Sequence, residues 1–115
     1  NANLRCKYGA DISIEAQIGE GMKLNHYVGI VIRSECKIGK NANIRQNTTI
    51  GRKTSNDVIG MTVIGDNVDI GAHSCIIGDI HIGHNVTIGA MTFVNKDVPD
   101  NSIIYNPVTS VIKTK

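Results

Sequence analysis

Residues 63–94 read VIGDNVDIGAHSCIIGDIHIGHNVTIGAMTFV, and this stretch decides the fold. It places an aliphatic residue at every sixth position from Ile64 to Val94. A helix needs apolar residues about 3.6 apart and a half-buried strand needs them two apart, so a step of six fits neither. It fits a coil with three sides, in which each side is a short strand of a six-residue unit and sharp corners join the sides.

The same step of six extends through most of the chain. Its register slips by two residues at Ile30–Val31 and again within 52–57. The aliphatic positions are Ile12, Ile18, Leu24, Ile32, Ile38, Ile44, Ile50, Ile64, Ile70, Ile76, Ile82, Ile88 and Val94. A second inward series follows four places later, at Ala16, Met22, Val28, Cys36, Ala42, Thr48, Val68, Ser74, Ile80, Val86, Thr92 and Val98. Glycine or asparagine commonly stands one place after the aliphatic, which favours a tight or left-handed backbone there.

The repeat predicts an all-β chain built as a parallel β-helix, whose stacked coils pair their backbones about 4.8 Å apart. We expect one domain over residues 1–115, with coils over about 6–99 and a tail over 100–115. Because the chain begins with Asn1 rather than methionine, we also expect a segment to precede it. A β-sandwich would instead need turn clusters about every 8–12 residues between alternating strands.

The composition excludes several partners and compartments. The 12 Lys and Arg nearly balance the 10 Asp and Glu, without runs of like charge, so we expect no nucleic-acid partner. No apolar stretch approaches the roughly 20 residues of a membrane span, and no signal peptide is recognisable, so the sequence predicts a soluble, cytoplasmic protein. Three cysteines at spacings that match no metal motif indicate reduced apolar fillers.

Counting by sixes predicts which residues stack on one another. Hexads beginning at Cys6, Leu24, Ile44, Ile64 and Ile82 are expected on one side, and those beginning at Ile12, Ile32, Ile50, Ile70 and Ile88 on the next. Asp11 then lies one coil below His26 on the same side, within reach of a carboxylate–imidazole hydrogen bond. We interpret His26 as a general base that Asp11 orients. The alternative is a solvent-facing histidine with an incidental acidic neighbour.

Three segments resemble the serine acetyltransferases, which are hexapeptide-repeat acyltransferases. They are ADISIEAQIGEGMKLNHYVGIVI (10–32), KIGKNANIRQNTTIG (37–51) and the stretch 63–94 quoted above. The resemblance covers about 8–107 and implies a left-handed β-helix, acetyl-CoA as a substrate and no metal. It also implies that Asp11 and His26 form a catalytic dyad and that a backbone amide near Arg52 stabilises the oxyanion. Coenzyme A is expected along the corners formed by Gly71, Ala72, Gly89 and Ala90. Lys96 is expected near one of its phosphates. Alanine also simply suits a tight corner, and Lys96 also suits a solvated surface.

The departures from this family concern the acceptor. Serine acetyltransferases have Asp where this chain has Asn25, and an Arg-His pair where it has Gly60 and Met61. Those charged groups would hold a zwitterionic serine, so their loss favours a neutral acceptor. Segments such as NIRQNTTIGRK (43–53) look more like the capsule and exopolysaccharide O-acetyltransferases. We therefore predict transfer to a sugar or polysaccharide hydroxyl, with Asn25, Gln46 and Met61 binding the acceptor.

Three alternatives stay open. Serine is the second candidate acceptor. A gamma-type carbonic anhydrase on the same fold would use three histidines on a metal, but His26 and His84 alone are expected to share a line, three coils apart. A non-catalytic β-helix is expected to lack Asp11 or His26, and both are present.

We expect a homotrimer or a dimer of trimers, because the flat sides of a prism offer long contact surfaces and the resembling family forms trimers. His26 and the line through Ala72 and Ala90 are expected at different corners. A complete site would then draw on two chains.

Overall fold

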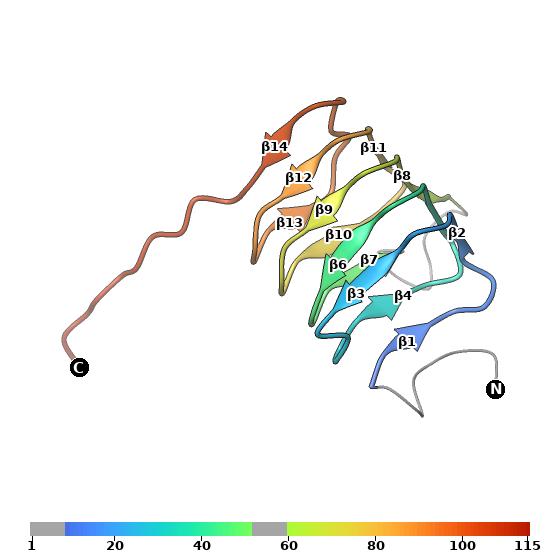
Figure 1. Cartoon of the computed structure of the whole chain (residues 1–115). Helices are drawn as coiled ribbons and strands as arrows, with labels where there is room; N and C mark the ends of the chain where they lie inside the picture. Colours follow the sequence, from blue (N-terminus) through green and yellow to red (C-terminus); the bar gives the residue numbers. More distant parts are fainter. Residues whose placement is uncertain (1–8, 52–59) are drawn as a thin grey trace.

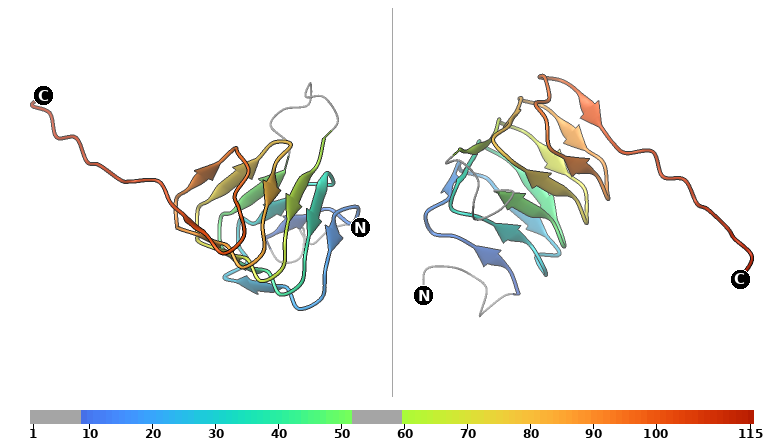
Figure 2. Two further views of the ribbon diagram at one scale, coloured as in Figure 1. Left: turned by 90° about the horizontal axis from the view of Figure 1, so that it is seen from above. Right: turned by 180° about the vertical axis from the view of Figure 1, so that it is seen from behind.

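The computed structural model describes residues 9–51 and 60–115. These residues form short parallel strands without any helix, so the described part of the chain has no helix that could span a membrane. The strands wind as a left-handed β-helix, whose coils stack along one axis (Figures 1 and 2). The predicted all-β fold is confirmed.

The strands form three sheets, one on each side of the prism. The first sheet contains β1 (Asp11–Ile12), β4 (Val31–Ile32), β7 (Thr49–Gly51), β10 (Cys75–Ile77) and β13 (Phe93–Val94). The second contains β2 (Gln17–Ile18), β5 (Cys36–Ile38), β8 (Thr62–Ile64) and β11 (His81–Ile82). The third contains β3 (Lys23–Asn25), β6 (Asn43–Arg45), β9 (Asp69–Ile70), β12 (Thr87–Ile88) and β14 (Ile103–Ile104).

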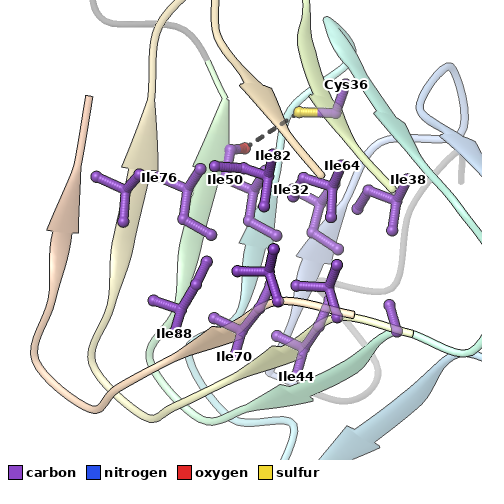
Figure 3. Packing of buried hydrophobic residues seen from close by; sticks show 14 of the residues in the cluster. Ile32, Cys36, Ile38, Ile44, Ile50, Ile64, Ile70, Ile76, Ile82 and Ile88 are labelled. Carbon is purple, nitrogen blue, oxygen red and sulfur yellow. Dashed lines mark hydrogen bonds between the residues drawn. The ribbon is translucent and has the colours of Figure 1, made fainter. Parts of the chain in front are cut away.

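The predicted inward residues form the core, as columns of stacked isoleucines along the axis (Figure 3). Burying one such side chain stabilises the fold by about 1.5–3 kcal/mol, and β-branched residues suit strands. The second inward series is also largely buried, with an exception at Val28. Val28 is 61% exposed and Ile30 is buried in its place, because two extra residues lengthen this corner.

From Ile64 onward, the hexads lie on other sides of the prism than predicted. Ile64 pairs with Ile38 rather than joining Leu24 and Ile44, and Ile82 follows Ile64 into the second sheet. Likewise Ile70 pairs with Ile44 in the third sheet, and Ile88 pairs with Ile70. The reason is that β7 of the first sheet and β8 of the second are consecutive among the described strands, whereas the prediction placed a further side of the prism between Ile50 and Ile64. A slip of two residues was predicted there, and the numbering from Ile50 to Ile64 requires eight beyond the usual six.

The left-handed residues lie three places after the aliphatic instead of one. Examples are Asn41, Asn67 and Asn85, with φ of 60°, 58° and 56°. The glycines one place after the aliphatic serve close packing between coils: a Cβ on Gly39 would lie 2.7 Å from the Gly65 carbonyl carbon. His26 departs from this rule, because it adopts φ 54° two places after Leu24.

The strands continue beyond the predicted end of the coils at about residue 99. Strand β14 pairs with β12 in the third sheet, so the coils reach Ile104. The segment after Ile104 extends away from the body as an exposed strand-free tail (Figure 2).

Candidate active site

His26 lies at the corner between the third and first sheets, directly after β3. The register of the third sheet aligns Leu24, Ile44, Ile70 and Ile88, so the residues two places later also align. These residues are His26, Gln46, Ala72 and Ala90. We call this line the His26 corner. The prediction that His26 and the two alanines occupy different corners is wrong, because the phase of the upper coils shifts.

Asp11 begins the first sheet at the same corner, one coil below the segment that starts with His26. The backbone N–H of Asp11 donates to the carbonyl of Ile30 at 2.8 Å, and the N–H of Gly29 donates to the carbonyl of Gly9 at 2.8 Å. Asp11 was predicted on the side that carries Leu24, and it lies instead in β1 of the next sheet. The two segments are nevertheless neighbours across this corner. The hydrogen bond between the Asp11 and His26 side chains stays a prediction.

The corner between β3 and β4 displays His26 on a strained backbone. His26 and Gly29 both have positive φ, of 54° and 76°, and the fully buried Ile30 anchors the end of the segment. A left-handed conformation costs a residue other than glycine roughly 1–2 kcal/mol. Positive φ recurs at the corners of other coils, for example at His73 and Met91, so this conformation belongs to the repeat.

A strip without side chains larger than methyl lies above His26, formed by Gly71, Ala72, Gly89 and Ala90. The buried hydroxyl of Thr48 donates to the carbonyl of Gly71 at 3.2 Å, and that of Ser74 donates to the carbonyl of Gly89 at 2.9 Å. Each carbonyl therefore points into the prism. In a planar trans peptide the following N–H points the opposite way. The N–H groups of Ala72 and Ala90 therefore face outward, and no hydrogen bond within 9–51 and 60–115 uses either as a donor.

The corner between the second and third sheets shows the opposite arrangement. We call it the His84 corner; its aligned residues are Glu20, Lys40, Asp66, His84 and Asp100. Here side chains from the coil above cap three of the backbone N–H groups. The Lys40 N–H donates to Asp66 Oδ1 at 2.8 Å, the Asp66 N–H to His84 Nδ1 at 2.7 Å, and the His84 N–H to Asp100 Oδ1 at 2.8 Å. Alanine cannot provide such a cap.

Polar side chains cover the outer face of the third sheet beside His26. Asn25 Nδ2 donates to Asn43 Oδ1, and Asn43 Nδ2 donates to Asp69 Oδ1 at 3.2 Å. The Arg45 guanidinium donates to the same Asp69 oxygen at 2.6 Å, with both side chains partly exposed. The sequence identified Asn25 but not Asn43, Arg45 or Asp69, because their contacts join residues 18 to 26 positions apart.

Gln46 lies between His26 and Ala72 in the His26 corner, and its role in binding the acceptor stays a prediction. Its Oε1 is buried and has no hydrogen-bond partner within the described ranges. A buried amide oxygen without a partner is unfavourable by about 1–3 kcal/mol. A donor from a bound molecule would satisfy it.

The remaining predicted residues lie elsewhere. Lys96, two places after Val94, is at the third corner, between the first and second sheets, and Met61 immediately precedes β8 at the same corner. We call it the Lys96 corner. Within one chain it is not the corner of His26 and the strip. Arg52 lies outside the described residues, so the oxyanion assignment stays a prediction.

The histidines are also dispersed. His26 and His84 do not share a line, contrary to the prediction, since they occupy different corners. The described ranges contain no group of three or more His, Cys, Asp or Glu side chains placed to hold a metal ion.

Cys36 and Cys75 are free thiols, as expected. Desolvation by burial raises the pKa of Cys36 to about 11 and also raises the pKa of Cys75. Both are therefore weak nucleophiles near neutral pH. Cys6 lies outside the described residues.

Comparisons with known proteins agree with this fold. The bacterial transferase hexapeptide (six repeats) family matches residues 61–96. Serine acetyltransferase 1, chloroplastic, of Arabidopsis thaliana is 45% identical over 92 residues, covering 80% of this chain and 29% of that protein. The putative colanic acid biosynthesis acetyltransferase WcaB of Escherichia coli K12 is 36% identical over 99 residues, covering 86% of this chain and 60% of that protein.

A solved structure of serine acetyltransferase in complex with coenzyme A, from Brucella abortus strain S19, superposes with a TM-score of 0.84 at 28% identity. The match covers 94% of this chain and 43% of that chain. The chain thus spans less than two thirds of each of these proteins. The six-residue repeat, the left-handed β-helix and these likenesses identify the chain as a member of the hexapeptide-repeat transferase family.

Proposed function

We propose that this chain is the catalytic part of an acetyltransferase that moves an acetyl group from acetyl-CoA to a hydroxyl of a saccharide. The observation that carries this proposal is the His26 corner, where a histidine and two outward N–H donors share one line. The relatives support the reaction type, because their names describe acetyltransferases.

The strip fits the extended, amide-containing arm of acetyl-CoA. Successive coils are about 4.8 Å apart, so the N–H groups of Ala72 and Ala90 present two donors at one coil spacing. Glycine and alanine keep side chains out of the path, so an elongated ligand can lie along the axis. In that orientation one end of the ligand is directed down the corner, past Gln46 and toward His26.

The proposed reaction is a direct transfer with His26 as the base. The imidazole takes the proton from the acceptor hydroxyl while its oxygen attacks the thioester carbonyl carbon. The tetrahedral intermediate collapses, the carbon–sulfur bond breaks, and the imidazolium returns the proton to the coenzyme A thiolate. Asp11, whose backbone binds the segment that follows His26, would orient the imidazole.

A neutral acceptor is favoured by the residues around His26. Asn25 offers no negative charge to an ammonium group, and Met61 lies at the Lys96 corner. Serine is the second candidate, because the relative with 45% identity is a serine acetyltransferase. A panel of saccharides and serine, compared by kcat/KM, separates the two acceptors.

The test of the proposal is release of free thiol from acetyl-CoA with a saccharide acceptor. His26→Ala should lower kcat by about 10²- to 10⁴-fold, the usual contribution of a general base. His84→Ala is the matched control, because it removes the same side chain from the His84 corner. Equal activity of wild type and His26→Ala would refute the proposal. If serine were turned over fastest, the assignment of a saccharide as the acceptor would be wrong.

We also infer that the chain forms a homotrimer. Large apolar side chains are exposed around the His26 corner and the upper edge of the first sheet, namely Tyr27, Val28, Met91 and Phe93. Contact with a neighbouring copy would bury them. Since His26 and the strip lie at one corner of the same chain, a second chain is not needed to bring them together. Sedimentation equilibrium tests the assembly, and a monomer at micromolar concentration would contradict it.

A further inference from the structure

The polar side chains beside His26 form a hydrogen-bonded ladder with a fixed direction. Its members are Asn25, Asn43, Asp69 and Arg45, and we call them the polar ladder. They belong to β3, β6 and β9, three successive strands of the third sheet. The backbone register places Asn25 beside Arg45 and Asn43 beside Asp69.

Asp69 sets the direction of the polar ladder. An ionised carboxylate only accepts hydrogen bonds, so Asn43 must turn its NH₂ group toward Asp69. The Oδ1 of Asn43 is then left to face Asn25, which must turn its own NH₂ group toward it. The amide oxygen of Asn25 therefore points away from the ladder. This assignment follows from the chemistry of the network, which is how amide orientations are decided.

Arg45 reinforces that direction. Its guanidinium donates to Asp69 at 2.6 Å and places a positive charge beside the carboxylate. The ladder therefore presents a hydrogen-bond acceptor at Asn25 without a net negative charge. Such a group binds a neutral O–H, and it offers little compensation for desolvating an ammonium ion.

Asn25 and His26 are adjacent in sequence. In the proposed site, each would offer a hydrogen-bond acceptor to the molecule that receives the acetyl group. In the proposed reaction the imidazole accepts the proton of the reacting hydroxyl, and the Asn25 oxygen can accept from a second hydroxyl of the same molecule. We propose that the polar ladder selects acceptors with a hydroxyl on the carbon next to the reacting one, a vicinal diol. Asp69 is the positioning residue that orients Asn25 through Asn43. This inference rests on the proposed saccharide acetyltransferase activity.

The sharpest test pairs a substrate change with a residue change. Wild type is assayed with a saccharide acceptor and with its analogue that lacks the neighbouring hydroxyl, and Asn25→Ala is assayed with the same two. A hydrogen bond contributes about 0.5–1.5 kcal/mol, so we expect wild type to lose about 3- to 10-fold in kcat/KM on the deoxy analogue. Asn25→Ala should show no further loss on that analogue. Equal losses in both proteins would overturn the inference.

The role of Asp69 has a separate readout. Asp69→Asn removes the group that can only accept, so Asn25 loses its fixed orientation. We expect the acceptor KM to rise about 3- to 10-fold while the KM for acetyl-CoA stays unchanged. The control is Asp66→Asn, which changes the corresponding kind of side chain at the His84 corner. An unchanged acceptor KM in Asp69→Asn, or an equal rise in the control, contradicts the assignment.

The two levels of proposal fail differently. If wild type released no thiol with any diol-containing saccharide, the proposed function would fall and this inference with it. If wild type turned over such acceptors but the deoxy analogue was used equally well, only the polar ladder's role would be lost. Thermal unfolding of each variant identifies loss of fold, and the Asn25→Ala comparison stands by itself if Asp69→Asn does not fold.

Discussion

The His84 corner and the His26 corner are built from the same repeat, and one difference between them lies two places after the aliphatic. At the His84 corner this position carries Asp66, His84 and Asp100, each of which binds a backbone N–H in the coil below. At the His26 corner the upper coils carry Ala72 and Ala90, and the donors stay open. In this fold, open backbone donors arise where the repeat omits its usual cap.

The interior hydroxyls complete the comparison. Thr48 and Ser74 bind the carbonyls of Gly71 and Gly89 from inside, so the orientation of the peptide is set by the core. The external surface therefore needs no side chain to present its donors. Such preorganised backbone groups lose little entropy when a ligand binds.

The largest effect is expected from a substitution that gives the His26 corner a side-chain cap and so removes its difference from the His84 corner. In Ala90→Asp, the carboxylate should bind the N–H of Ala72, as Asp66 binds that of Lys40. It also adds a negative charge to the proposed path of a negatively charged ligand. We expect the KM for acetyl-CoA to rise about 10- to 100-fold, from the loss of one or two hydrogen bonds and from charge repulsion.

The matched control for Ala90→Asp is His84→Asp, which exchanges one cap for another at the His84 corner. Its KM for acetyl-CoA should equal that of wild type. An unchanged KM in Ala90→Asp would show that acetyl-CoA does not use this strip. Isothermal titration with coenzyme A gives the same comparison without turnover.

The comparison can be sharpened by removing a hydroxyl from the core. Ser74→Ala leaves the Gly89 carbonyl without its donor, and a buried unsatisfied group of this kind lowers the free energy of unfolding by about 1–3 kcal/mol. The Ala90 N–H also loses its fixed direction, so binding of coenzyme A should weaken together with stability. Urea unfolding and titration measure the two effects.

Thr62→Val provides the counterpart at the Lys96 corner, where the single O–H of Thr62 is shared between the carbonyls of Gly51 and Gly78, at 3.0 and 2.7 Å from Oγ1. We expect a similar loss of stability without a change in affinity for coenzyme A. If both variants weakened binding equally, the effect of Ser74 would be a general loss of fold.

The smallest expected effect is the removal of one cap from the His84 corner. His84→Ala takes away the acceptor of the Asp66 N–H at an exposed position, where water replaces it. We expect the free energy of unfolding to fall by about 0.5–1.5 kcal/mol, with acetyl-CoA kinetics unchanged. A large loss of activity in this variant would place the His84 corner in the site and overturn the contrast between the corners.

The sequence predicted the repeat and most of the inward residues, because these depend on short spacings, but it placed Asp11 on the side of Leu24 rather than in the next sheet. It misplaced Val28 and the hexads from Ile64 onward. Both errors come from insertions: a repeat shows that residues have been added but not how many sides of the prism they occupy. The offset of 26 positions between Ile44 and Ile70 was therefore not available from counting.

The candidate site divides in the same way. His26, Asn25, Gln46 and the two alanines were singled out from residue types and from resemblance. Their alignment at one corner, and the separation of Lys96 and Met61 from it, follow only from the strand register. The polar ladder was missed because its hydrogen bonds connect strands on different coils.

By itself, the sequence determined the coil: a step of six with aliphatic residues inward selects short strands and corners, since each unit must bury one face. The tertiary structure decided which corners align and which way the peptides at Gly71 and Gly89 face. Those features depend on contacts between coils, where buried hydroxyls and neighbouring side chains compete for backbone groups. Residue order along the chain does not record the outcome of that competition.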